Sequence, residues 1–321
     1  MLNVKKNSQT ALKFLFRAAI ASLAALMAAG CSGSEEKQQQ RVVFTTILPQ
    51  KDFVQRVAAD RFEVNALVGP GQSPHDFIVT PEQMVRLSQA EIFFRIGVEA
   101  EEGFLPRIIA SNPGLKIADL REGVRMRDIE QPCEHDGHHH SHDDNHRDKH
   151  HHYHNHGSKD PHIWLSPVTV KQIAMTIKNT LVEQDPEGEQ IYARNLASFI
   201  DELDSLDTFL RRVFAPYKGR YLFVFHPAFG YFADEYGLKQ MAIETGGKEP
   251  SARALTRLLD LAKEHNPGVI FVQPQYSEKS ARAIAEQIGC AVVTINPLPE
   301  NYIKEMRTMA EAIRESFEQK K

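Results

Sequence analysis

The sequence predicts an α/β protein of two lobes, each with a four-stranded parallel sheet flanked by helices, and one long backbone helix that joins the lobes. Three observations lead to this prediction. Short apolar segments alternate with helix-like segments, a rhythm typical of parallel sheets. The second half of the chain repeats the rhythm of the first, and a long helical pattern separates them. A chain of 321 residues also exceeds what one small core accommodates.

Each half contains four short apolar segments that we interpret as strands. In the order of the chain, they cover residues 42–48, 64–68, 92–96, 116–118, 221–225, 240–243, 269–272 and 291–295. Helices are expected between the strands, and the start of one of them is well marked. Thr80 offers an N-cap hydroxyl, Pro81 occupies the first helical position and Gln83 the third.

A helix over residues 187–215 is expected to connect the two lobes. Leucine, phenylalanine and valine recur there at alternating spacings of three and four, which marks one apolar face of a helix. About 28 helical residues at about 1.5 Å each span about 42 Å, enough to cross from one lobe to the other. The lobes are then residues 42–186 and 216–321. Two shorter helices with a kink are the alternative.

Residues 1–30 have the composition of an export signal. Four basic and no acidic side chains accompany a short apolar run from Ala18 to Ala29, which cannot span a bilayer. The run ends in Leu-Met-Ala-Ala-Gly before Cys31, which resembles a bacterial lipobox. We therefore expect a lipidated Cys31, a polar tether over residues 31–41, and a protein anchored on the periplasmic or cell-surface side of a membrane. An ordinary cleaved signal is the alternative.

The composition excludes two classes of protein and is unusual in its histidine content. With 38 basic and 42 acidic residues, a net charge of -4 and 42% hydrophobic residues, the chain is neither a disordered polymer nor a basic nucleic-acid binder. Its 15 histidines are the unusual feature. Eleven of them lie between residues 135 and 156, which leaves four to consider one at a time.

Three of those four histidines lie where parallel sheets bind ligands. His75 is in a loop after the expected strand 64–68, and His226 directly follows the strand 221–225. His162 lies between prolines just before a helix. Ligands collect outside the carboxyl ends of parallel strands, so these histidines are expected to face one cleft and to bind metal. Taken singly, each could instead be a hydrogen-bonded loop or core residue.

Five motifs, in a fixed order, carry a resemblance to a known family. They are Ser-Pro-His-Asp at 73–76, Asp-Pro-His-Ile-Trp-Leu-Ser-Pro at 160–167, His-Pro-Ala-Phe-Gly-Tyr-Phe at 226–232, Phe-Val-Gln-Pro-Gln at 271–275 and Asn-Pro-Leu at 296–298. The chain resembles the zinc and manganese solute-binding proteins of bacterial ABC importers, the cluster A-I (ZnuA/TroA) family, over nearly all of residues 42–318. The resemblance implies two α/β lobes joined by a backbone helix, with metal in the cleft between them.

The same resemblance implies that the metal ligands are His75, His162 and His226. Manganese-type members generally carry a carboxylate at the third position, so His226 indicates the zinc subtype, because imidazole suits zinc and manganese prefers oxygen donors. The implied function is the high-affinity zinc-binding component of an ABC importer, which delivers Zn²⁺ to a membrane permease. Zinc is then a transported ligand, and the protein is a monomer, not an enzyme, with no nucleic-acid partner.

The resemblance leaves the fourth ligand open. The family's usual carboxylate is Asn296 here, and its Glu-Pro-Gln string reads Gln-Pro-Gln at 273–275. Both changes remove negative charge, so we expect water, or an oxygen from the histidine-rich loop, to complete a tetrahedron. Asp76, Asn296 and Gln273 are candidates for the fourth ligand or for a supporting role. For Asp76 the expected role is to orient His75.

The histidine-rich insertion is expected to be a mobile loop over residues 133–159 of the first lobe. Half of residues 135–156 are His, four are Asp and almost none are apolar, so they cannot build a core. Imidazoles at this density are expected to form weak, overlapping metal sites. The auxiliary ligands are His135, His138, His139, His140, His142, His146, His150, His151, His152, His154 and His156.

Two other functions compete with zinc transport at this stage. A metal-storage or adhesion lipoprotein would use the histidine-rich loop as its working part. A zinc hydrolase would use the three histidines and an activated water, but it needs a general acid or base beside that water. Among the motifs, Asp76 alone is available for that role.

Overall fold

The computed structural model describes residues 41–129, 159–244 and 252–318. The first lobe contains β1 (Val42–Thr45), β2 (Glu63–Ala66), β3 (Ile92–Arg95) and β4 (Lys116–Asp119), in the order β2-β1-β3-β4. The second contains β5 (Tyr221–Val224), β6 (Lys239–Ala242), β7 (Val269–Val272) and β8 (Ala291–Thr294), in the order β6-β5-β7-β8. All pairs are parallel. The predicted fold class is confirmed, and each strand begins within one residue of its expected start.

The identical strand order places a switch point in each sheet. The connections from β1 to β2 and from β3 to β4 leave in opposite directions, as do those from β5 to β6 and from β7 to β8. Loops diverge at the carboxyl ends of strands beside such a point, which makes it the usual position of a ligand site. The residues that follow β5 and β7 are therefore well placed to contribute to one.

Helices flank both sheets. The first lobe has α2 (Leu48–Ala58), α3 (Pro81–Leu87), α4 (Glu99–Ser111), the short η1 (Ile163–Leu165) and α5 (Pro167–Gln184), and the second has α7 (Gly230–Tyr236), α8 (Ala252–His265), α9 (Glu278–Ile288) and α10 (Tyr302–Glu318). The predicted start of α3 is confirmed: the Gln83 amide N–H donates to the Thr80 hydroxyl, and the Gln83 side chain accepts from the Thr80 N–H.

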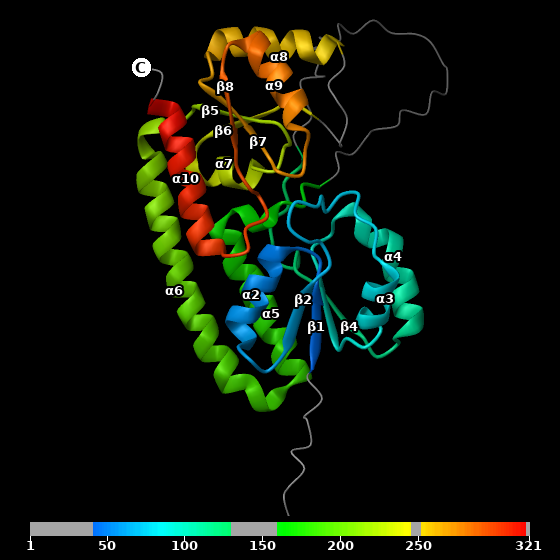
Figure 1. Ribbon diagram of the computed structural model, residues 1–321. Helices are drawn as coiled ribbons and strands as arrows, with labels where there is room; N and C mark the ends of the chain where they lie inside the picture. The colour runs from blue at the N-terminus through cyan, green and yellow to red at the C-terminus, as the bar shows by residue number, and fades with distance from the viewer. Residues whose placement is uncertain (1–40, 130–158, 245–251, 319–321) are drawn as a thin grey trace, which may run out of the picture. The chain divides into compact units, whose positions relative to one another are not determined.

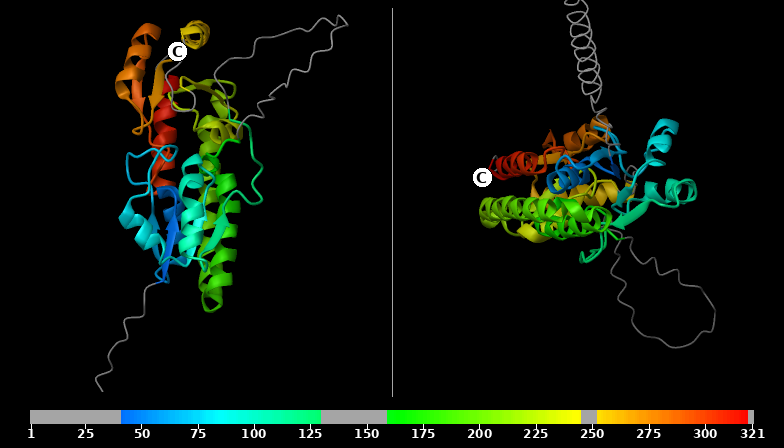
Figure 2. Two further views of the ribbon diagram at one scale, coloured as in Figure 1. Left: turned by 90° about the vertical axis from the view of Figure 1, so that its right-hand side faces the viewer. Right: turned by 90° about the horizontal axis from the view of Figure 1, so that it is seen from below.

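The long helix between the lobes is α6 (Glu189–Phe214), preceded by η2 (Pro186–Gly188) and followed by η3 (Ala215–Tyr217). Its 26 residues form one continuous helix, which excludes the two-helix alternative. Figures 1 and 2 show it running beside α5 and α10. Its buried face is made of Tyr192, Leu196, Phe199, Leu203, Leu206, Leu210 and Phe214.

Among the described residues, the hydrophobic cluster along α6 extends through both lobes, and each lobe has a further cluster of its own. The buried side chains of α6 belong to the same cluster as Val43 and Phe94 of the first sheet and Val224 and Phe271 of the second. The last helix strengthens this connection, because the Tyr302 N–H at the start of α10 donates to Asp52 of α2 (3.1 Å). The spacing between the lobes is therefore held by packing on two sides.

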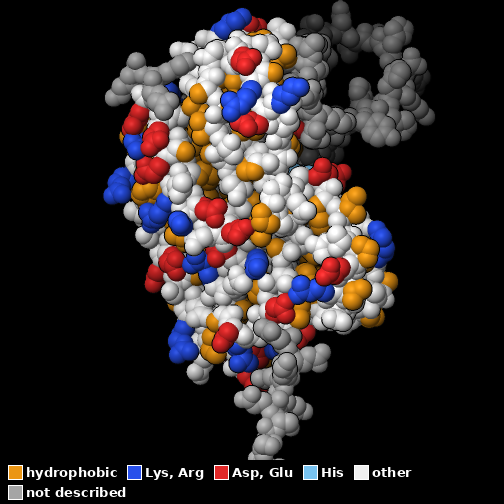
Figure 3. Space-filling view, in the orientation of Figure 1, with side chains coloured by type: hydrophobic (Ala, Val, Ile, Leu, Met, Phe, Trp, Pro, Cys, Tyr) orange, Lys and Arg blue, Asp and Glu red, His pale blue; other side chains and the backbone are white. Residues whose placement is uncertain are grey.

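Several expectations concern residues outside the described part of the chain. They are the export signal and tether within residues 1–40 and the histidine-rich residues 130–158. The described residues on either side of the latter meet, because Asp128 and Lys159 form an antiparallel bridge and an ion pair (2.7 Å). Within the described ranges, no helix is long and apolar enough to cross a membrane. On the face shown in Figure 3, basic and acidic side chains lie interspersed.

Asp185 anchors the turn between α5 and α6. Its carboxylate accepts hydrogen bonds from the Arg61 guanidinium (2.8 Å) and from the Tyr192 hydroxyl, and it forms an ion pair with Arg41 (3.3 Å). The hydrogen bond from Arg61 holds the pKa of Asp185 below its ordinary value of 3.8. Such a carboxylate stabilises the fold fully at pH values above its ordinary pKa. This stabilisation is lost as the pH falls through the lowered pKa of the folded state.

We therefore predict that Asp185→Asn lowers the free energy of unfolding at pH 7 by about 1–3 kcal/mol, because two arginines lose a charged partner. The difference from the wild type should shrink as the pH falls below 3.8, because the unfolded chain then binds a proton at Asp185 more readily than the native carboxylate does. Urea unfolding at pH 7 and pH 3 measures both effects. The matched control Asp201→Asn, at an exposed position of α6, should change stability by less than about 0.5 kcal/mol. An equal difference at both pH values would contradict the role of the carboxylate.

Candidate metal centre

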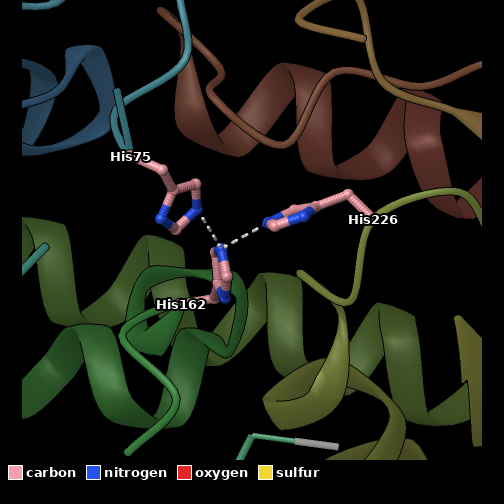
Figure 4. A group of neighbouring side chains, drawn as sticks. All are labelled: His75, His162 and His226. Atoms are coloured by element: carbon pink, nitrogen blue, oxygen red, sulfur yellow. Dashed lines mark hydrogen bonds between the residues drawn. The ribbon is translucent and has the colours of Figure 1, made fainter. Parts of the chain in front are cut away.

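Three imidazoles from distant parts of the chain meet at one point. The Nε2 atom of His162 lies 3.2 Å from Nε2 of His75 and 3.2 Å from Nε2 of His226. One ligand nitrogen from each ring lies within 4.8 Å of the other two. His75 comes from the loop after β2, His162 precedes η1, and His226 follows β5 (Figure 4).

The separation of these nitrogens matches that of ligands around one zinc ion. Zinc binds imidazole nitrogen at about 2.0–2.1 Å, and two ligands of a tetrahedron at that radius lie about 3.3–3.4 Å apart. The nitrogens of His162 and its two neighbours are 3.2 Å apart. An ion of this size fits between the rings with little movement of the side chains.

Neighbouring strands of the second sheet fix the position of His226. Its backbone N–H donates to Gln273 Oε1 (3.1 Å), and its carbonyl accepts from Gln273 Nε2 (3.0 Å). Gln273 is fully buried and directly follows β7, the strand beside β5. Both ends of its amide are thus occupied by the His226 backbone. Of the two roles considered for Gln273, this placement fits the supporting one.

Two buried carboxylates orient two of the rings. Nδ1 of His162 is hydrogen bonded to Asp160 Oδ1 (2.7 Å), and Nδ1 of His226 to Glu244 Oε1. Asp160 is 0% exposed and Glu244 1%. A carboxylate at Nδ1 places the proton on that nitrogen and leaves the Nε2 lone pair for a metal. Neither carboxylate was predicted from the sequence to have a role. Glu244 lies 18 residues beyond His226, and only the pairing of β6 with β5 could have revealed it.

Arg127 balances the charge of Asp160 and connects it to the second lobe. Its guanidinium lies 3.2 Å from Asp160 and 3.0 Å from Asp234 of α7. Gly230, at the start of α7, makes room for this contact, because a Cβ there would lie 1.3 Å from Nη1 of Arg127. The Tyr231 hydroxyl also donates to the Asp160 carbonyl (3.0 Å). The segment that carries His162 is therefore attached to both lobes.

The surroundings of the rings favour neutral imidazole. Burial lowers the pKa of His75 to about 2, and the neighbouring His162 and His226 act in the same direction. Burial also lowers the pKa of His226, against the opposing effect of its hydrogen bond to Glu244. Neutral imidazole is the form that binds metal, so the lowered pKa values of His75 and His226 favour their binding state at neutral pH.

The cavity between the rings is small, partly open and lined in part by aromatic side chains. It measures about 10 Å³ and is lined by the three histidines together with Trp164, Tyr276 and five other residues. Tyr276 stacks on His226 with ring centroids 4.8 Å apart. The buried Trp164 donates its indole N–H to the Pro297 carbonyl (2.7 Å), which joins the first lobe to the loop after β8. This volume suits one ion or one water molecule.

The other described candidates for the fourth ligand, Asp76 and Asn296, do not line this cavity. Asp76 is exposed and makes no hydrogen bond with any described residue. Asn296 belongs to a turn after β8, where its side chain accepts from the Leu298 N–H (3.0 Å) and donates to the Leu298 carbonyl (3.1 Å). Cys31 and the histidines of the insertion lie outside the described residues.

Two α/β lobes share a core along one continuous helix, and a cavity between them is lined by three imidazoles. This arrangement defines a two-lobed solute-binding protein with a candidate site for a transition metal. The sequence matches the ZnuA family, described as "Zinc-uptake complex component A periplasmic", over residues 43–316. The chain belongs to this family, and the prediction of the family from its motifs is confirmed.

Individual relatives agree with this assignment. The high-affinity zinc uptake system protein ZnuA of Bacillus subtilis (strain 168) is 32% identical over 289 residues, which cover 85% of each chain. The zinc-binding lipoprotein AdcA of Streptococcus pneumoniae (strain ATCC BAA-255 / R6) is 27% identical over 94% of this chain, and this chain spans 60% of its length. A crystal structure of a ZnuA deletion mutant with zinc bound is similar with a TM-score of 0.75 at 33% identity, over 87% of this chain and 98% of that one.

The buried carboxylate behind His226 yields a prediction. Glu244→Gln keeps the shape of the side chain but removes its charge, so the affinity for zinc should fall by about 10- to 100-fold. Competition with a chromophoric chelator measures the change, and a thermal unfolding scan of the apoprotein shows whether the fold is retained. Glu286→Gln, at an exposed position of α9, is the matched control. Equal affinity in Glu244→Gln and the wild type would contradict the orienting role.

Proposed function

We propose that this protein is the zinc-binding component of an ABC importer, which captures Zn²⁺ between His75, His162 and His226 and delivers it to a membrane permease. The convergence of three imidazoles carries the proposal: Nε2 of His162 lies 3.2 Å from Nε2 of His75 and of His226, and one ligand nitrogen of each ring lies within 4.8 Å of the others. Two of the rings are already held by buried carboxylates. The site therefore requires little reorganisation to bind the ion, which favours high affinity.

The cavity favours capture of a metal ion over catalysis. Its volume of about 10 Å³ matches one ion and offers no enclosed pocket for an organic substrate. Among the described residues that line it there is no carboxylate to act as a general base toward a metal-bound water. We therefore propose that zinc is cargo and that the protein is not an enzyme.

We further propose that the protein is exported and held at a membrane by a lipid on Cys31, with residues 31–41 as a tether, and that it acts as a monomer. The lipobox-like string before Cys31 supports the anchor, and so does the description of AdcA as a lipoprotein. In this arrangement residues 42–186 and 216–321 are the lobes and residues 187–215 connect them. The histidine-rich loop over 133–159 provides auxiliary, weaker sites.

Zinc titration of matched variants tests the position of the tight site. A chain lacking residues 135–156 should keep one tight site, and His162→Ala should lose it, because the remaining two imidazoles cannot hold zinc as firmly. Isothermal titration calorimetry measures the stoichiometry and affinity of each variant. His265→Ala is the control, since His265 stacks on Tyr221 away from the cavity. Loss of the tight site with the loop, combined with its survival in His162→Ala, would favour the storage alternative.

The chemistry of the ligands predicts selectivity. Three nitrogen donors should favour zinc over manganese by more than about 100-fold, because manganese prefers oxygen ligands. His226→Glu, which replaces one nitrogen donor by a carboxylate, should reduce this ratio. Competition between the two ions, with bound metal quantified by mass spectrometry, measures it. Equal binding of both ions by the wild type would contradict the interpretation of His226.

A further inference from the structure

Gln275 contributes a buried oxygen without a partner to the wall of the metal cavity. The residue lines the cavity together with His75, His162 and His226. Its Oε1 atom is buried and accepts no hydrogen bond from any described residue. Buried carbonyl oxygens normally have a donor, because leaving one unsatisfied is costly. The cavity should therefore supply that donor.

A chain of amide contacts fixes which end of the Gln275 side chain is free. Asn296 Oδ1 accepts from the Leu298 N–H (3.0 Å), which identifies this atom as the carbonyl oxygen. The same oxygen lies 3.4 Å from Gln275 Nε2 and accepts from it. A rotated Gln275 amide would place two oxygens together, so Nε2 stays on Asn296 and Oε1 stays free.

His162 and His226 cannot supply the missing donor while they bind a metal. Their Nε2 atoms face the shared point, and Nδ1 of His162 and of His226 already donates to a carboxylate. Three imidazoles leave one position of a zinc tetrahedron open, and a water in that position is a strong hydrogen-bond donor. The cavity is partly open, so a water can reach this position beside the ion.

We propose that Gln275 Oε1 accepts a hydrogen bond from a water that completes the coordination of the bound zinc, with Asn296 as the residue that positions Gln275. This inference rests on the proposed function of the three histidines. A neutral amide accepts the hydrogen bond without acting as a base toward the water. Asn296, where this chain lacks the family's usual carboxylate, thus acts together with Gln275 to support the fourth ligand.

Displacement of the water by an anion tests the proposal. The full chain is loaded with one equivalent of Co²⁺, and thiocyanate binding at the open position is followed by visible absorption. Gln275→Met removes the acceptor at similar size, so the water is held less firmly and thiocyanate should bind about tenfold more tightly than in the wild type. Gln275→Glu keeps an acceptor and adds charge, so its thiocyanate affinity should equal or fall below that of the wild type. Gln287→Met, exposed on α9, should match the wild type.

Zinc binding by the same variants distinguishes a Gln275 that supports a bound water from a Gln275 that coordinates zinc directly. Gln275→Met should still bind one zinc ion, with affinity reduced by no more than about tenfold. If it loses zinc as completely as His162→Ala, Gln275 is itself a ligand and the proposal is overturned. Equal thiocyanate affinity in Gln275→Met and the wild type would overturn it as well. Failure of the proposed function would instead be seen as full zinc binding by His162→Ala.

Discussion

The apolar packing along α6 is the constraint on which the metal site depends. Two of the three imidazoles belong to the first lobe and one to the second, so the spacing of their nitrogens is only as fixed as the spacing of the lobes. The buried face of α6 belongs to one core that includes strands of both sheets. The contact of Tyr302 with Asp52 and the indole hydrogen bond of Trp164 add two further connections. This packing prepares the site before a metal arrives.

Electrostatics complements this rigidity without placing charge on the ligands themselves. Asp160 and Glu244 are buried behind two of the rings, and Arg127 offsets Asp160. The negative charge therefore acts on the metal through the imidazoles, while the described cavity wall offers neutral groups. Such an arrangement attracts a divalent cation but supplies no general base at the open position, which suits reversible capture better than chemistry on a substrate.

Local sequence patterns were sufficient to predict the helices and strands of the fold. Strand positions followed from short apolar segments, the start of α3 from its capping residues, and α6 from a regular apolar stripe. The three histidines became candidates because they follow strands or precede a helix, where ligands collect in parallel sheets. Their local sequences also carried the resemblance to the family. No such local signal marked Glu244, and Asp160 and Gln275 stood within motifs without an assigned role.

What the sequence determined by itself was therefore the set of elements, their parallel class and the residue types available for metal binding, because these depend on neighbours within about one helical turn or one strand. The tertiary structure alone decided which polar groups face the histidines. Glu244 reaches His226 through the pairing of β6 with β5, and Arg127 reaches Asp234 across the lobes. Contacts of this kind arise where segments far apart in the chain pack together, and a periodic pattern in one segment carries no information about its distant partner.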